Sequence, residues 1–173
     1  MTVKEFIQNV LIGEIKKIQQ EEGHHYISFG LISQGIEFLG ACLDNEPFNT
    51  NTRGISSQRF NKAITELFDS KYHTFVKTRS TEQFDLYGNL RCGLLHVFVP
   101  GADLEVIQES EIKDYGEHLD VKNLRNNDRL ILVSQNLMAD FENACNNIIA
   151  RIDNNQITNN KVYNQLLSTS PED

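Results

Sequence analysis

The stretch YISFGLISQGIEFLGACL, residues 26–43, decides the fold expected for this chain. Apolar residues recur along it at helical intervals, and small residues lie between them, which is typical of a helix that packs on more than one side. We therefore expect a central helix over 26–43, against which the other elements pack.

The segment before it predicts an amphipathic helix. Thr2 and Glu5 have the spacing of a capping box, and the apolar residues that follow recur at helical intervals to about Gln20. A break at Glu22-Gly23 separates this helix from the central one. We expect the two helices to form a long antiparallel hairpin.

Two more helices are expected in the middle of the chain. The stretch 44–57 is rich in Asn, Thr, Pro and Gly, which predicts a loop that ends by capping a third helix at Ser56 or Ser57. Ser80 and Gln83 repeat the capping-box spacing and open a fourth helix, which ends at Pro100-Gly101.

The C-terminal part of the chain predicts a change of structure. Short apolar runs typical of strands occur at 104–108 and 130–133, with 118–121 as a third candidate. We expect a small antiparallel β element there. A final helix is predicted over 134–152, followed by polar chain.

These elements indicate a mainly α protein, a bundle of about five helices with the β element inserted at about 104–133. The length of 173 residues suits one continuous core. We expect a single helical domain over 1–153 and a polar, weakly ordered segment over 154–173, because no repeat or linker divides the chain.

Composition and charge narrow the functional classes. Three cysteines without a C-x-x-C pair indicate neither a disulfide framework nor a cysteine zinc site, which favours a reducing cytoplasm. We expect no signal peptide and no membrane span. The net charge of −8 lies mostly in residues 101–173, and tight nonspecific nucleic-acid binding usually needs a strong basic surplus. The acidic charge therefore argues against tight nonspecific binding of nucleic acid, whereas RNA as a transient substrate is compatible with it.

The segment DLYGNLRCGLLH, residues 85–96, is where catalytic residue types interrupt an apolar helical pattern. On an ideal helix Arg91 lies on the apolar side, where a guanidinium needs an acceptor because it stays charged. A carboxylate or helix carbonyls elsewhere in the fold would make Arg91 structural, and a polar opening would leave it free for a ligand. His96 lies on the other side of the helix, in line with Cys92.

The side that carries His96 is small, because Gly88, Cys92 and Gly93 lie there. Another backbone can approach it closely, either from a partner helix or from within the chain. Cys92 is also a candidate thiolate nucleophile, although a cysteine on a packed helix is usually a small core residue. The histidines, including the adjacent His24-His25, show no zinc-binding spacing, so we expect no metal and no cofactor.

The run Arg91-Cys-Gly-Leu-Leu-His96 resembles the R-x(4–6)-H signature of HEPN (higher eukaryotes and prokaryotes nucleotide-binding) domains. The expected order of elements extends the resemblance: a long helical hairpin, a shorter third helix, and the motif near the end of the next helix. Those domains are helical bundles, often dimeric, and many are metal-independent endoribonucleases of toxin, defence or RNA-processing systems. The resemblance implies a HEPN-like bundle with Arg91 and His96 as the catalytic pair and RNA as the substrate.

In that chemistry a 2′-hydroxyl attacks the neighbouring phosphate. His96 would transfer a proton and Arg91 would oppose the developing charge, with Asn89 and Tyr87 as candidate positioning residues. On an ideal α-helix the two catalytic side chains diverge by roughly 140°, so we expect a homodimer to complete the site. The alternative is a non-catalytic helical module that binds an antitoxin or another protein partner.

Overall fold

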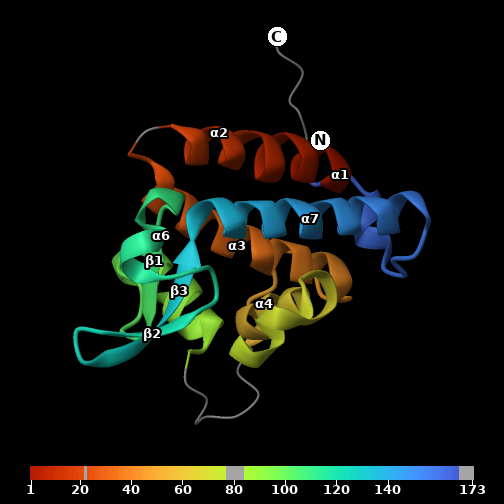
Figure 1. Cartoon of the computed structure of the whole chain (residues 1–173). Coiled ribbons are helices and arrows are strands. Elements are labelled where there is room, and N and C mark those ends of the chain that lie inside the picture. The colour runs from red at the N-terminus through yellow and green to blue at the C-terminus, as the bar shows by residue number, and fades with distance from the viewer. Residues whose placement is uncertain (22, 77–83, 168–173) are drawn as a thin grey trace.

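The computed structural model describes residues 1–21, 23–76 and 84–167, most of which are helical (Figure 1). The chain begins with one continuous helix made of three segments: α1 (Val3–Phe6), the π-helical segment η1 (Ile7–Glu14) and α2 (Ile15–Gln20). The predicted capping box is present, because Thr2 accepts from the Glu5 N–H while Glu5 accepts from the Thr2 N–H.

The central helix is α3 (His25–Leu43), as the sequence predicts. It packs against α2, against α4 (Ile55–Leu67) and against α7 (Ser134–Asp153), and Figure 1 shows α7 between the first helix above and α4 below. α3 is long and apolar enough to cross a membrane by length and composition, but more than half of that stretch is buried inside the fold, as in a core helix. Three helices therefore pack around α3.

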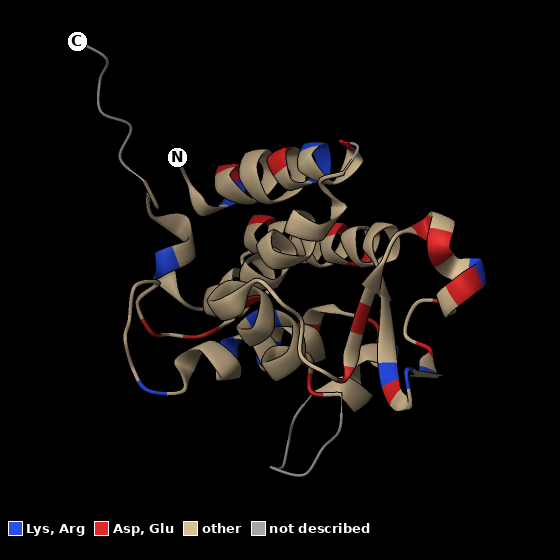
Figure 2. Cartoon of the chain, turned by 90° about the vertical axis from the view of Figure 1, so that its left-hand side faces the viewer, with Lys and Arg blue, Asp and Glu red and all other residues tan. Residues whose placement is uncertain are grey.

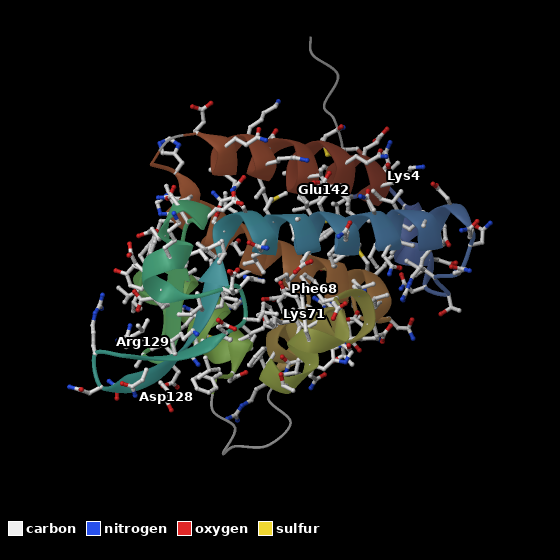
Figure 3. All side chains as sticks on the ribbon, viewed as in Figure 1. Lys4, Phe68, Lys71, Asp128, Arg129 and Glu142 are labelled. Carbon is white, nitrogen blue, oxygen red and sulfur yellow. The ribbon has the colours of Figure 1, made fainter. Side chains whose placement is uncertain are left out.

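Ion pairs at the surface join the first helix to α7. Lys4 contacts Asp153 at 2.7 Å and Lys16 contacts Glu142 at 2.8 Å. Figure 3 labels Lys4 and Glu142 on the two neighbouring helices. Because all four side chains are partly exposed, each pair adds less than about 1 kcal/mol, and the buried apolar face provides most of the attachment.

The β element is a mixed sheet rather than the expected antiparallel one. Its strands β1 (Leu104–Ile107), β2 (Val121–Leu124) and β3 (Asn127–Val133) lie in the order β1-β3-β2. β2 and β3 are antiparallel, joined by a tight turn at Arg125-Asn126, whereas β1 is parallel to β3. The prediction was wrong because the chain between β1 and β2, which contains the short helix α6 (Ile112–Tyr115), places β2 on the far side of β3. β1 therefore pairs with β3, which runs in the same direction.

Two predicted helix starts differ from the structure. α4 begins at Ile55 after Gly54, which has a φ of 79° and offers no side-chain cap, while the Ser57 hydroxyl donates to the Gly54 carbonyl instead. The predicted start of the fourth helix, Ser80 with Gln83, lies outside the described residues. Phe84 has a φ of 62°, so the described part of that helix begins after it.

The C-terminal segment differs from the expected weakly ordered chain as far as residue 167. Ile157 and Val162 are buried in the main core, and the Asn159 side chain donates to the Cys42 carbonyl at 2.7 Å. A short 3₁₀ turn, η5 (Asn160–Tyr163), includes Lys161. These two apolar side chains, spaced among polar ones, anchor a segment whose average composition indicates a loop.

Candidate functional site

Arg91 and His96 lie on one short helix that changes type between them. Tyr87–Cys92 form the π-helical segment η3, and Gly93–Val97 form α5. π-Helical segments are rare in proteins, and those that occur often lie at functional sites. A π turn contains more residues than an α turn, so each residue rotates less about the axis. The two side chains therefore diverge by less than the ideal α-helix predicts.

The acceptor expected for Arg91 is a carboxylate on the central helix. The Arg91 Nε donates to Glu37 Oε2 at 2.7 Å, and the guanidinium lies 5.7 Å from the centre of the Tyr87 ring. Among the described residues, nothing accepts a hydrogen bond from the terminal nitrogens of Arg91. One side of the guanidinium is therefore fixed, and the other has the capacity to bind a ligand.

Arg91 and Glu37 line a pocket of about 210 Å³ between α3 and the motif helix. Its other lining residues are mostly apolar and come from α3, the loop after it, α4 and α5: Gln34, Phe38, Ala41, Phe48, Arg59 and Leu95. Arg59 in this wall is almost fully buried, and all three of its side-chain nitrogens donate hydrogen bonds to the loop that follows α3. The pocket therefore holds one fully satisfied arginine and one partly satisfied arginine.

His96 is exposed at the end of α5, beside an exposed apolar run. Val97, Phe98 and Val99 are 67%, 73% and 59% exposed. Phe98 has a φ of 57°, which is rare for a bulky side chain, and the Tyr26 hydroxyl donates to its carbonyl at 2.7 Å. The run next to His96 is therefore held in a defined conformation although it faces solvent.

The small side of the motif helix is filled from within the chain. A Cβ added at Gly93 would lie 2.6 Å from the Val99 carbonyl oxygen. The Gly101 N–H donates to the Asn89 carbonyl at 2.8 Å, and Gly101 lies against the Asn89 side chain. Of the two expected backbone approaches, the intramolecular one is observed, and Asn89 holds the turn rather than lining the pocket.

Tyr87 lies where it can support Arg91. Its ring contacts the guanidinium on one side and the Phe60 ring, 5.7 Å away, edge to face. Burial raises the pKa of Tyr87, and the neighbouring Cys92 thiol adds to the effect. A neutral phenol ring of fixed orientation is consistent with the positioning role expected for Tyr87.

The residue that sequence reasoning missed is Glu37. It is the one charged side chain in the helix over 25–43, and a lone carboxylate in a buried helix needs a partner. Arg91 is likewise an arginine on an apolar side of a second helix, so these two observations together could have suggested an Arg91–Glu37 pair. The sequence alone does not show which carboxylate reaches across 54 positions.

A polar cluster away from the pocket involves His118. The Val133 N–H donates to His118 Nδ1 at 2.9 Å, so the ring proton lies on Nε2, which is 2.7 Å from the Tyr72 hydroxyl. That hydroxyl in turn donates to Asp140 at 2.7 Å. Burial lowers the pKa of His118 to about 4, and Asp140 opposes this only in part. No group of three His, Cys, Asp or Glu side chains able to hold a metal occurs in the described ranges.

An apolar groove continues from the pocket along α3. One section, of about 420 Å³, lies between α3 and the first helix, and another, of about 210 Å³, lies between α3 and α5. Leu31 and Gln34 line both sections, and Gln34 also lines the pocket beside Arg91. The candidate site therefore opens onto a longer, mostly apolar surface.

None of the family models, curated proteins or solved structures compared with the chain matches it. The resemblance to HEPN domains rests on the spacing of Arg91 and His96 and on the helical order around them. The geometry of this site therefore carries the functional argument.

Proposed function

We propose that this chain is a HEPN-like, metal-independent endoribonuclease that works as a cytoplasmic homodimer, with Arg91 and His96 as its catalytic residues. The observation that best supports the proposal is the state of Arg91. Glu37 fixes its Nε, while its terminal nitrogens have no described partner and the residue lines a pocket. Arg59, in the same wall, shows the contrasting pattern of an arginine whose nitrogens are all used by the fold.

The proposed reaction needs only Arg91, the His96 side chains of two copies of the chain, and the RNA. His96 takes the proton of a 2′-hydroxyl, whose oxygen then attacks the adjacent phosphorus. The 5′-oxygen leaves and takes up a proton from the second, protonated His96, which gives a 2′,3′-cyclic phosphate and a 5′-hydroxyl. Arg91 donates to the phosphate oxygens as their charge increases. The exposure of His96 is consistent with direct contact to a substrate as large as RNA.

A second copy of the chain is expected at the surface beside His96. Ile27 on α3 and the run Val97–Val99 are more than half exposed and apolar, which is typical of a surface that another protein covers. In a two-fold interface each chain uses the same patch, so a dimer centred there brings both His96 residues close together. The pair of histidines then supplies one base and one acid.

The charge distribution is consistent with local rather than extended RNA recognition. Figure 2 shows Lys and Arg intermixed with Asp and Glu on the side that it presents, with acidic residues near α6. Binding along many phosphates needs a continuous basic surface. The proposed enzyme would therefore hold one or two nucleotides at the site and release the products readily.

The test is cleavage of mixed RNA in the presence of a chelator. We expect the wild type to produce 2′,3′-cyclic phosphate ends, and Arg91→Ala and His96→Ala each to lose about 100-fold or more of the activity. His73→Ala and Arg53→Ala are matched controls, because both residues are exposed and neither lines the pocket. Equal activity in all five proteins would identify a contaminant and end the proposal.

A non-catalytic module that binds an antitoxin or another protein partner is the second candidate. The exposed apolar run Val97–Val99 favours it, and so does the Arg91–Glu37 pair, which can exist for stability alone. The activity of the wild-type protein on RNA distinguishes the ribonuclease from the binding module. A protein with native helix content that leaves RNA intact, with and without divalent ions, supports the module and contradicts the ribonuclease.

A further inference from the structure

We propose that the pocket beside Arg91 receives a nucleobase, and that it selects cytosine over uracil at the nucleotide whose 2′-hydroxyl attacks. This inference rests on the proposed ribonuclease function and deepens it by naming the base. The pocket of about 210 Å³ has the liquid volume of roughly seven water molecules. A pyrimidine ring has a comparable number of non-hydrogen atoms.

The walls and the polar groups of the pocket suit a flat, partly polar ring. Phe38, Phe48 and Leu95 supply apolar surface, and the stacked pair Phe38–Phe48, with ring centres 5.2 Å apart, stiffens one wall. Gln34 lies on α3 one turn before Glu37, at the exposed rim. Apolar walls with a few placed polar groups are the usual character of a small-molecule site.

Glu37 is the group that distinguishes one base from the other. Its Oε2 accepts from Arg91, and its second oxygen has no hydrogen-bond partner among the described residues. An ionised carboxylate only accepts hydrogen bonds, and it is a known partner of the cytosine amino group. Uracil places a carbonyl oxygen at the same position, which would face the carboxylate without a proton between them. The second oxygen of Glu37 therefore favours cytosine.

A nucleotide fits the site better than a side chain of a partner protein. A lysine or arginine would satisfy the free oxygen of Glu37, but it would bring a second cation next to Arg91. A nucleotide instead carries a phosphate for the terminal nitrogens of Arg91 and a neutral ring for the pocket. A nucleotide therefore supplies a partner for Arg91 and a partner for Glu37 within one small molecule, and both residues line one pocket.

The test compares cytidine with uridine within each variant, so that the ratio does not depend on total activity. We expect wild-type protein to bind cytidine 3′-monophosphate about tenfold more tightly than uridine 3′-monophosphate, and to cleave after cytidine with the same preference. In Glu37→Gln the amide oxygen is needed by the Arg91 Nε, so the amino group of the new amide turns to the pocket. It donates to the uracil carbonyl, and the preference should shift to uridine.

Glu14→Gln is the matched control, because it makes the same charge change in the neighbouring groove and outside the pocket. It should keep the cytidine preference. A ratio that Glu37→Gln leaves unchanged, or a wild type that cleaves RNA without any base preference, overturns the base pocket and leaves the ribonuclease standing. Cytidine-selective binding without cleavage supports the pocket and ends the ribonuclease proposal. If the protein neither binds these nucleotides nor cleaves RNA, both proposals are overturned.

Discussion

The two arginines that line the pocket are held in different ways, and this difference supports the role proposed for Arg91. Arg59 is 5% exposed and donates to both oxygens of Asp44 and to the carbonyls of Glu46, Pro47 and Phe48. Arg91 makes one such bond. An arginine that serves the fold uses its whole fork of donors, whereas an arginine that serves a ligand leaves part of it open.

Replacing each arginine with methionine should therefore cost different amounts of stability. Arg59→Met removes the donors to the Pro47 and Phe48 carbonyls and leaves Asp44 paired with Lys161, and it should lower the free energy of unfolding by about 3 kcal/mol. Arg91→Met breaks one partly exposed pair and should cost about 1 kcal/mol. Urea denaturation of the two variants measures the difference. Equal costs would mean that Arg91 is structural.

His118 should make the stability of the protein depend on pH. Its pKa is lowered from 6.5 to about 4 by burial, so the unfolded chain binds a proton that the folded chain does not bind between these values. Stability is therefore complete above pH 6.5 and is lost as the pH falls toward 4, by about 3 kcal/mol from this group. Protonation of Nδ1 also breaks its bond from Val133.

Denaturant unfolding of the wild type and of His118→Gln across pH 4 to 7 measures this contribution. The groups that face His118 are Tyr72, Asp140 and Lys71, and they remain in both proteins. The variant should therefore lack about 3 kcal/mol of the pH dependence while it retains the part due to carboxylates. Parallel curves for the two proteins would contradict this prediction, because they would show that His118 has the same pKa in the folded and unfolded states.

At the scale of the elements, α3 is shaped by glycines that have different neighbours. A Cβ at Gly40 would overlap the backbone of Arg59 on α4, whereas a Cβ at Gly30 meets only the Leu94 Cβ at 3.9 Å, an ordinary contact. The first position allows α3 and α4 to touch, and the second is free to carry a methyl group.

The two alanine variants should move stability in opposite directions. Gly40→Ala forces the helices apart and should cost about 3 kcal/mol. Gly30→Ala should add about 0.5 kcal/mol, because alanine loses less backbone entropy than glycine in a helix. Thermal unfolding of both variants tests this. A loss at Gly30 equal to that at Gly40 would contradict the close packing of α3 on α4.

Sequence patterns predicted the long elements and missed the features that depend on contacts between elements. α3 and α7 were placed within a residue or two because their apolar periodicity is long. The π segments in the first helix and around Arg91 leave no such trace, since the same apolar stripe fits both helix types. Likewise the parallel pairing of β1 with β3 depends on the path of the chain through α6.

The candidate site was predictable to the same extent. The need of Arg91 for an acceptor followed from its place on an apolar side of a helix, and the structure supplies Glu37. Asn89 was expected near a substrate because it shares a helix with the motif, but it is used in the turn at Gly101. Spacing along one helix shows which residues are neighbours on that helix, and not which partner reaches them from another.

At the scale of the whole molecule, the apolar run beside His96 predicts association of two chains. Phe98→Asp should raise the dissociation constant of the proposed dimer about 100-fold, since a central aromatic residue usually carries much of the binding energy. Val121→Asp is the control, because Val121 is also exposed and apolar but lies on β2. Sedimentation equilibrium measures both. A wild type that is monomeric at tens of micromolar would contradict the dimer.

The strand order β1-β3-β2 has a consequence for the behaviour of the protein at high concentration. Among the described strands, β2 pairs with β3 on one side and with none on the other, so its other edge carries backbone groups that could template strand addition between molecules. The strand has four residues, among them Lys122 and Asn123, which are exposed and polar, and short charged edges resist such growth. Concentrated samples should therefore not form fibrils through this edge of the sheet.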